Sequence, residues 1–406
     1  MNTGDTAFVL ISTALVMLMT PGLALFYGGM ARSKNALGTI MQSFIMLGLV
    51  TLEWVLWGYS LSFGPDHAGL VGGLEWFGLR GVGITPSPDY GSTIPHLAFM
   101  IFQCMFAIIT PALMTGAFAE RMKFNALFVF TLLWATLVYN PLCHWVWGVG
   151  GWMGRLGALD FAGGTVVHIS SGISALAAIL VIGKRLEYGK KAYIPHNIPM
   201  TITGAALLWF GWFGFNAGSA LACNGIAANA FVVTHVASAV AGLSWMFMEW
   251  IHRGKPTTLG AASGAVAGLV AITPASGFVG PMPALIIGLF AGILCYAAIL
   301  MKARFAYDDS LDVVGIHGCG GIWGALATGL FASKGVNPNG ANGLFFGNPA
   351  QLGIQSVAVL ATIVYAFSLS YVLLKIIDKT IGLRVSEQDE ISGLDLSQHD
   401  ETAYTF

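Results

Sequence analysis

Charge is scarce in this sequence. Only 9% of its 406 residues are Asp, Glu, Lys or Arg, while 56% are hydrophobic. A soluble globular domain carries about 25% charged residues, because water must wet its surface. So few charges cannot cover a water-facing surface of this size, and we expect the outside of the protein to face lipid.

Two further shortages narrow the class of protein. Lys and Arg number 18 against 19 Asp and Glu, so no concentrated basic surface is available for nucleic acid. The cysteines show no CxxC spacing, which predicts packing in apolar runs rather than a disulfide or zinc framework. They are Cys104, Cys143, Cys223, Cys295 and Cys319. We expect no cleavable signal, because the first apolar run is too long and no basic segment precedes it.

Long apolar runs are what the sequence has in abundance. Each of eleven runs is long enough to cross about 30 Å of hydrocarbon as a helix. They lie at about 7–30, 37–63, 95–119, 124–147, 162–182, 197–217, 226–250, 258–276, 281–301, 311–331 and 351–377. The 53 glycines fit this interpretation, since small residues let membrane helices approach closely. We predict an all-α polytopic membrane protein with eleven transmembrane helices.

The segments between these runs carry the charges and predict the orientation. With the amino terminus outside, all lysines and arginines except Arg80, Arg155 and Lys334 fall on the inside. The positive-inside rule favours this arrangement, which puts the carboxyl terminus in the cytoplasm. Residues 1–380 form the predicted membrane domain. Residues 381–406 form a tail that is acidic after Arg384 and has the composition of a solvated, partly disordered end.

Two short motifs occur twice, five spans apart. ITPA appears at Ile109–Ala112 and at Ile272–Ala275. A histidine followed four residues later by Gly-Ile appears at His168 and at His317. An aspartate precedes each histidine, and the two aspartates are Asp160 and Asp312.

The spacing of these motifs predicts an inverted repeat. Because five is an odd number of spans, the second half must cross the membrane in the opposite direction. We expect the halves at about 7–182 and 197–331, with an extra eleventh helix at about 351–377. In transporters built this way, the functional site lies near the midplane where the halves meet.

Ionisable side chains inside the apolar runs are candidates for function, because burying them in a membrane is costly. They are His168, His235, His317, Glu53 and Glu249. The repeat would bring His168 and His317 together at the centre, so we predict a functional pair. His235 and Glu53 have no such partner, which favours structural roles for them.

Two central imidazoles without a carboxylate favour the passage of a neutral molecule. A metal site normally takes three or four ligands, and neither an HxxxH motif nor a His–Glu cluster is present, so we predict no metal and no cofactor. A bare ion would lose its hydration without gaining a counter-charge. A small neutral molecule, or a weak acid that sheds its proton, could pass in single file, since each neutral ring offers one donor and one acceptor.

Aromatic side chains gather toward the outer ends of spans three, four and six. They are Phe106, Trp147, Trp212, Phe213 and Phe215, with Ser219 close by. Aromatic faces attract compact cations by roughly 0.5–2 kcal/mol, so such a cup could collect ammonium. The alternative is a belt of aromatic residues at the membrane interface.

Several long strings closely resemble the bacterial Amt type of the Amt/Mep ammonium transporter family, within the wider Amt/Mep/Rh superfamily. They are LDFAGGTVVHISSG (Leu159–Gly172), GWFGFNAGS (Gly211–Ser219), PALMTGAFAERMKF (Pro111–Phe124), DVVGIHGCGGIWG (Asp312–Gly324) and GLRVSEQDEISGLD (Gly382–Asp395). The resemblance runs along essentially the whole chain. It implies eleven helices around an internal pseudo-twofold axis, a homotrimer in the cell membrane with one ammonium or ammonia pore per subunit, and no enzyme activity.

The resemblance also implies roles for individual residues. The outer ammonium-binding cup corresponds to Phe106, Trp147 and Ser219. The stacked phenyl gate corresponds to Phe106 and Phe215. The paired pore histidines correspond to His168 and His317.

Two features at the edges of the pore have counterparts in the same family. Asp160 matches a family aspartate, and its position before Gly163, Gly164 and Thr165 favours a helix cap and structural support over direct cation binding. The tail resembles the one through which PII-type signal proteins block the cytoplasmic mouth. Glu53 has no explanation at this level.

Three other functions are compatible with parts of the pattern. A membrane sensor could use the same cup with little flux, and a neutral-solute channel, for urea as an example, could use the same pore. A membrane redox protein could hold a haem with His168 and His317 as axial ligands.

The haem alternative has a direct test. We expect the visible absorption spectrum of the purified protein to show no Soret band, because the sequence offers no pattern for a cofactor beyond the two histidines. A Soret band that disappears in His168→Leu would contradict the transport interpretation.

Overall fold

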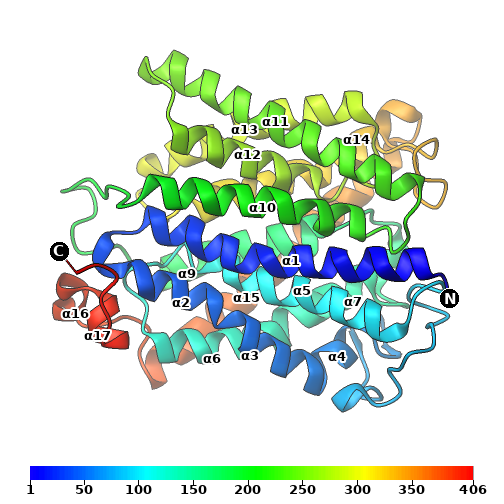
Figure 1. The fold of residues 1–406 in the computed structure, drawn as a ribbon, viewed down its shortest axis with the longest axis horizontal. Helices are drawn as coiled ribbons and strands as arrows, with labels where there is room; N and C mark the ends of the chain where they lie inside the picture. The colour runs from blue at the N-terminus through cyan, green and yellow to red at the C-terminus, as the bar shows by residue number, and fades with distance from the viewer. Residues whose placement is uncertain (406) are drawn as a thin grey trace.

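The computed structural model describes residues 1–405 and consists mostly of long helices that run side by side (Figure 1). The first half contains α1 (Thr3–Met30), η1 (Ser33–Asn35), α2 (Ala36–Phe44), α3 (Met46–Glu53), η2 (Trp54–Gly58), α4 (Tyr59–Phe63), η3 (Phe77–Leu79), α5 (His96–Met114), α6 (Phe124–Trp134), η4 (Ala135–Tyr139), α7 (Asn140–Trp147), α8 (Trp152–Leu156), η5 (Gly164–Ile169) and α9 (Ser170–Ile182). The second half contains α10 (Ile198–Gly218), α11 (Gly225–Arg253), α12 (Thr258–Ile272), α13 (Pro281–Phe305), η6 (Val314–Cys319) and α14 (Gly320–Phe331). The elements η7 (Leu344–Phe346), α15 (Pro349–Thr380), α16 (Glu387–Ser392) and α17 (Leu394–His399) complete the chain, and the strands β1 (Asp66–His67) and β2 (Val71–Gly72) pair as a short antiparallel hairpin.

The predicted spans correspond to helices, with one exception in length. Within residues 1–405, 10 helical segments are long and apolar enough to cross a membrane. The eighth predicted span, 258–276, is helical only as α12, whose 15 residues extend about 22 Å at the usual rise. The chain continues through turns that include Pro274, where the missing N–H of proline disfavours further helix. The second ITPA copy therefore lies almost wholly outside a helix, whereas Pro111 of the first copy lies inside α5.

The two ends of the molecule are distinct, and the termini lie at opposite ends (Figure 1). We call the end with the amino terminus and the β1–β2 hairpin the N face, and the end with α16 and α17 the C face. The backbone N–H of Asn2 donates to the carbonyl of Thr93 at 2.6 Å, which fixes the start of α1 to the long N-face segment. Termini at opposite ends are what an odd number of spans requires.

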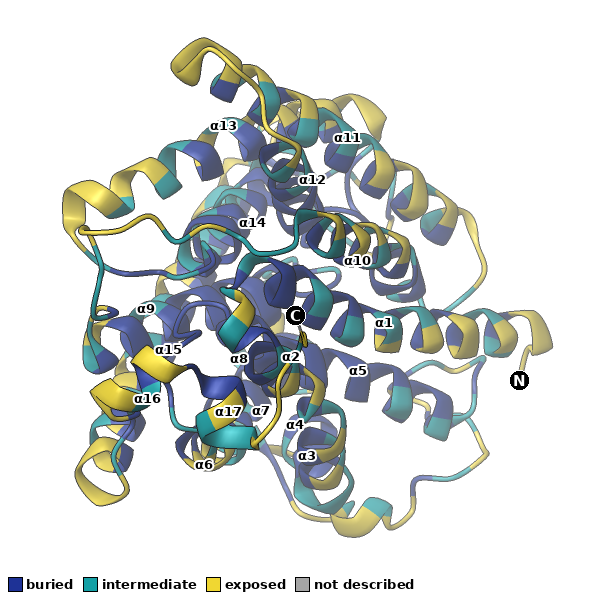
Figure 2. Cartoon of the chain, turned by 60° about the vertical axis from the view of Figure 1, so that its left-hand side comes forward, coloured by how far each residue is buried: buried dark blue, intermediate teal, exposed yellow. Residues whose placement is uncertain are grey.

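Reciprocal packing confirms the inverted repeat. α1, which opens the first half, packs along α10, which opens the second. η5 of the first half packs against α14, and η6 of the second half packs against α9. The extra helix α15 lies along α9 and α14. The interior of this assembly is buried, and exposed positions lie on the outward sides of helices such as α11 and α13 (Figure 2).

The carboxyl-terminal tail is folded and docked, which corrects the expectation of a partly disordered end. The buried Asp395 carboxylate accepts hydrogen bonds from the N–H groups of Leu37 (3.0 Å) and Gly38 (2.7 Å), in the first turn of α2. Glu390 accepts from the N–H of Leu186 at 2.8 Å and pairs with Arg384 at 2.7 Å. Composition missed this docking because the acidic side chains are matched by partners from distant loops.

A buried cluster of charges joins four loops at the C face. Glu120 pairs with Arg32 (2.8 Å) and Arg185 (3.3 Å), and Asp308 pairs with Arg185 (2.8 Å) and Arg121 (3.8 Å). Burial opposes the charged form of Glu120, but Arg185 and Arg32 outweigh it and hold the pKa of this carboxyl below its usual range. Burial likewise opposes ionisation of Asp308, and Arg185 and Arg121 hold its pKa low.

We expect Arg185→Met to destabilise the protein by about 3–5 kcal/mol, because both carboxylates lose a buried counter-charge. The measurement is thermal unfolding in detergent, with Arg80→Met, at an exposed N-face position, as the control. Since the folded-state pKa values of Glu120 and Asp308 are lowered, their contribution is present above about pH 4 and is lost as pH falls below it. An equal unfolding temperature for both variants would contradict this assignment.

Candidate functional site

The two motif histidines meet at the centre of the molecule. His168 lies in η5 and His317 in η6, and both are buried, at 1% and 3% exposure. Their Nδ1 atoms are 3.3 Å apart, and the rings are nearly parallel, with centroids 5.3 Å apart. A contact between two ring nitrogens needs a donor and an acceptor, so the facing nitrogens share one proton. The structure therefore brings together the pair that the repeat predicts.

A close approach of backbones makes this contact between the halves possible. A Cβ on Gly172 would lie 2.2 Å from the backbone nitrogen of Gly318, the residue that follows His317. Any side chain at position 172 would push η6 away from α9. The repeated motif has a glycine four residues after the histidine. In the first half this glycine is Gly172, and the close approach of the two backbones explains why the position has no side chain.

Asp160 caps the segment that carries His168, as predicted for structural support. Its carboxylate accepts from the N–H groups of Gly163 (2.8 Å), Gly164 (2.6 Å) and Thr165 (2.8 Å), and from the Thr165 hydroxyl. A carboxylate is the favoured acceptor for the unpaired N–H groups at a helix start.

The counterpart of Asp160 in the second half is Asp309 rather than Asp312. Asp309 precedes His317 by the same eight residues as Asp160 precedes His168, and it accepts from the N–H groups of Val313 (3.1 Å) and Val314 (2.8 Å). Burial, together with neighbouring Asp312, raises the pKa of Asp309 to about 6. Asp312 instead forms an ion pair with Lys302. The sequence comparison paired the nearer aspartate, whereas equal spacing identifies the correct one.

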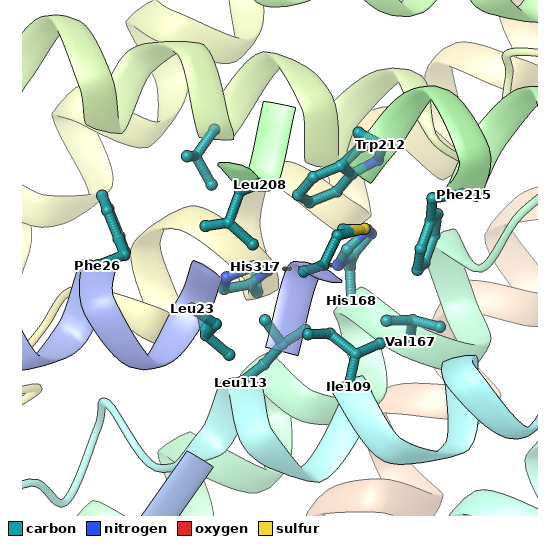
Figure 3. Close-up of a pocket in the computed structure, with 12 residues that line it drawn as sticks. Leu23, Phe26, Ile109, Leu113, Val167, His168, Leu208, Trp212, Phe215 and His317 are labelled. Atoms are coloured by element: carbon teal, nitrogen blue, oxygen red, sulfur yellow. Dashed lines mark hydrogen bonds between the residues drawn. The ribbon is translucent and has the colours of Figure 1, made fainter. Parts of the chain in front are cut away.

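The histidines line a small apolar chamber (Figure 3). Its volume is about 10 Å³, roughly the space that one water-sized molecule needs. No Asp, Glu, Lys or Arg lines it, and the other lining residues are Met19, Leu23, Phe26, Ile109, Leu113, Val167, Leu208, Trp212, Phe215 and Val266. The Nε2 atom of His168 has no hydrogen-bond partner within the described chain, so a guest in the chamber has a polar atom to meet.

Two phenyl rings close the chamber toward the N face. The centroids of Phe106 and Phe215 are 4.2 Å apart, at an angle of 30°. Phe215 lies 6.2 Å from the ring of His168, and Trp212 lies 5.5 Å from both His168 and Phe215. The indole N–H of Trp212 donates to the hydroxyl of Thr273 at 2.8 Å, so this ring is fixed, whereas the two phenyl groups form no hydrogen bonds.

A larger cavity, the vestibule, opens above these rings at the N face. It has a volume of about 340 Å³ and contains the three predicted cup residues, Phe106, Trp147 and Ser219. Trp147 stands perpendicular to Phe106, with centroids 5.9 Å apart, and its indole N–H donates to the carbonyl of Asp160 at 2.8 Å. The Ser219 hydroxyl donates to the carbonyl of Phe215 at 2.8 Å, which leaves its oxygen free to accept from a cation with N–H groups.

Sequence reasoning missed several vestibule residues. Asp89, Tyr90 and Gln103 also line it, and Gln103 has a buried side-chain oxygen without a partner among residues 1–405. Gln103 was within reach of sequence reasoning, because it precedes Phe106 by three residues and so shares its helix face. Asp89 and Tyr90 belong to a loop, where no periodicity guides the assignment.

A third cavity lies on the opposite side of the chamber, at the C face. Its volume is about 480 Å³, and Met30, Asp312 and Ser263 are among its lining residues. Met30 is one helical turn beyond Phe26, which lines the chamber. The three cavities therefore follow one another from face to face, interrupted at the phenyl pair and around Phe26.

Of the remaining candidates, His235 lies away from this path, whereas Glu249 lines the C-face cavity. His235 is exposed on α11, with its ring 5.4 Å from that of Trp209. Glu249 accepts from the N–H and hydroxyl of Thr257, both at 2.8 Å, which joins the end of α11 to the start of α12. Residues 1–405 contain no group of three or more His, Cys, Asp or Glu side chains arranged to hold a metal ion.

The geometry of the histidine pair argues against a haem between the rings. A metal–imidazole bond is about 2 Å long, so two axial ligands need about 4 Å between their nitrogens. The 3.3 Å contact between the Nδ1 atoms is shorter than that.

Comparison with known proteins agrees with this architecture. The profile of the Ammonium Transporter Family matches residues 7–404. The chain belongs to this family. An ammonium transporter of Bacillus subtilis is 54% identical over 405 residues, which cover 100% of this chain and 99% of that protein. The resemblance inferred from the motifs is confirmed.

Solved structures extend the likeness of this family member to three dimensions. The crystal structure of Saccharomyces cerevisiae Mep2 superposes with a TM-score of 0.90 at 36% identity, covering 95% of this chain and 88% of that one. A structure of a sensor Amt protein gives a TM-score of 0.90 at 30% identity, covering 98% of each chain.

The contributions of the two capping aspartates, Asp160 and Asp309, to the stability of this family member can be compared directly. We expect Asp160→Ala to destabilise the protein by at least about 2 kcal/mol, because several N–H groups lose a charged acceptor. Asp309→Ala should cost less, since fewer N–H groups depend on it. Thermal unfolding in detergent measures both, with exposed Glu387→Ala as the control, and the reverse order of the two aspartates would contradict their assigned roles.

Proposed function

We propose that this protein conducts ammonium nitrogen across the cell membrane, with ammonia as the species that passes the centre. The observation that carries the proposal is the pair of contacting histidines in an apolar chamber without charged side chains. An ammonium ion that enters such a chamber would lose its hydration without gaining a counter-charge. Ammonia avoids that cost and can accept a hydrogen bond from one ring and donate to another.

In this proposal the vestibule recruits the cation. The faces of Phe106 and Trp147 attract ammonium, and the Ser219 oxygen accepts one of its N–H groups. Binding there is supported by the perpendicular rings, which line two walls of one cavity. Ammonium gives its proton to water in the vestibule, which opens at the N face, and ammonia then passes the rings of Phe106 and Phe215, which act as a gate and must move apart for each passage.

The orientation and assembly are also part of the proposal. Basic residues concentrate at the C face, so the N face is outside and the C face cytoplasmic. We propose a homotrimer, by analogy with the family, and no catalytic activity. The tail, residues 381–406, is the proposed regulatory segment, and a PII-type protein at the C face is its proposed partner. The docking of Asp395 on α2 supports a tail whose position influences the helices.

A second candidate is ammonium sensing with little flux. The structural similarity to a protein described as a sensor Amt protein favours this candidate. Ammonium pulses on proteoliposomes at several pH values, with current and internal pH recorded together, distinguish the two. Neither a current nor a pH change, despite ammonium binding, would favour the sensor.

The central test replaces both histidines by leucine. We expect the ratio of ammonium to potassium transport, recorded as current and internal pH together, to fall by about tenfold or more, a difference of about 1.4 kcal/mol, because the chamber loses both imidazoles. His235→Leu, the same change on an exposed face of α11, should leave the ratio unchanged. An unchanged ratio in the double variant would show that the histidines do not select the species that passes.

A further inference from the structure

A second polar site lies inside the membrane, apart from the pore. Glu53 ends α3 within the second predicted span and is fully buried, at 0% exposure. One carboxylate oxygen, Oε1, accepts from the Asn140 amide at 2.7 Å and from the Thr136 hydroxyl at 3.3 Å. The other, Oε2, has no partner within residues 1–405. Gly58 packs directly against the carboxyl group, where a Cβ would lie 2.3 Å from Oε2.

The backbone around Glu53 shows the same irregularity as the backbone around the histidines. Four widened, π-helical turns occur in the described chain: η2, η4, η5 and η6. Two carry His168 and His317. The other two flank Glu53, since η2 follows it directly and η4 contributes Thr136. Widened turns of this kind occur frequently at functional sites, and here they accompany both polar groups of the membrane interior.

No counter-charge accompanies this carboxyl group. The titratable groups that face it are Cys104 of α5 and Tyr139 of η4, and the Thr136 hydroxyl receives the indole N–H of Trp57 at 2.9 Å. No Lys, Arg or His among residues 1–405 forms an ion pair with Glu53. A buried carboxylate with one oxygen unpaired is far more costly than a neutral carboxylic acid.

A file of polar groups leads from Glu53 toward the N face in two hydrogen-bonded segments, which meet at Ser62 without a hydrogen bond between them. The Asn140 side-chain oxygen accepts from the Ser62 hydroxyl at 3.2 Å. The Ser62 carbonyl contacts Nδ1 of His144 at 3.0 Å, and Nε2 of His144 contacts the Asp66 carboxylate at 2.9 Å. The Asp66 side chain is 24% exposed, so water reaches this end of the file.

The outer end of the file can hold an extra proton. Both ring nitrogens of His144 face acceptors, a carbonyl and a carboxylate, and each of these contacts needs a hydrogen. Both contacts are hydrogen bonds at once only when the pair of His144 and Asp66 carries one proton more than a neutral ring and a carboxylate would. The hydrogen bond from His144 holds the pKa of Asp66 below its usual range. A group that stores a proton thus stands where water meets the file.

We propose that Glu53 is a proton-binding site inside the membrane, occupied at neutral pH, and that its acid hydrogen exchanges with water from the N face along the side lined by Asn140, Ser62, His144 and Asp66. The ligand of this site is the proton itself, because the carboxyl group packs directly against Gly58 and a larger ligand would not fit between them. α5 lies between this site and the chamber, so the site is separate from the proposed ammonia path and does not depend on it.

Infrared spectroscopy of the reconstituted protein tests the proposal. We expect a C=O stretching band of a protonated carboxylic acid at pH 7 that is lost in Glu53→Gln. It should be retained in Glu249→Gln, because the Glu249 carboxylate is satisfied by Thr257. In the wild-type protein, ¹³C labelling of glutamate carboxyl groups should shift the band, which tests the proposal even if a variant folds poorly. The proposal would be overturned by a band that does not shift when the glutamate carboxyl groups carry ¹³C, or by a band that persists in Glu53→Gln.

The connection to the N face has its own test in the same experiment. When the buffer is changed to D₂O, the band shifts as the acid proton exchanges. We expect His144→Gln to slow this shift several-fold, because the file loses its proton-holding end. His252→Gln, which removes a ring hydrogen-bonded to Tyr296 at the C face, should exchange at the wild-type rate. Equal slowing in both variants would overturn the proposed route.

Discussion

The contact between His168 and His317 is the constraint on which the rest of the structure depends. Two rings from opposite halves can touch only where the two backbones nearly touch, and the gap of 2.2 Å between a Cβ on Gly172 and the Gly318 nitrogen shows how little room remains. The inverted repeat supplies the approach from both sides, because each histidine segment packs against the helix that follows the other. The widened turns carry the two rings, which line the small chamber at this junction.

The distribution of charge follows from this dry centre. The chamber is lined without charge, so the charges of the chain must be satisfied elsewhere. At the C face they form a buried network in which Arg185 bridges Glu120 and Asp308. That network joins loops from both halves and holds the helix ends in register. The result is a strong division between a neutral interior, where a solvated cation is penalised, and a highly charged end, where the folded tail docks.

The sequence predicts the framework because periodic burial and repeated motifs are local signals. The apolar runs predict the spans. The repeated motifs around His168 and His317, five spans apart, predict that both histidines lie at the centre. Prediction from the sequence fails where a residue's role depends on contacts that local patterns do not show. The capping role of Asp309 was missed because more than one aspartate precedes His317. Only the hydrogen bonds from the backbone N–H groups of Val313 and Val314 identify Asp309 as the cap. The tail was expected to be solvated, since nothing local shows that Asp395 meets the first turn of α2. Glu53 stayed unexplained, because Asn140 and Thr136 belong to another span.

Asp160 shows how one residue can serve two parts of the site through different atoms. Its carboxylate caps the turn that carries His168, while its backbone carbonyl receives the indole N–H of Trp147 at 2.8 Å. The wall of the vestibule and the histidine of the chamber are therefore fixed to the same residue. A displacement of this turn would move both together, so the proposed cation site in the vestibule and the proposed ammonia site in the chamber keep their spacing across the phenyl rings between them. A structural role for Asp160 is thus also a positioning role, because the substrate must pass from one of these sites to the other.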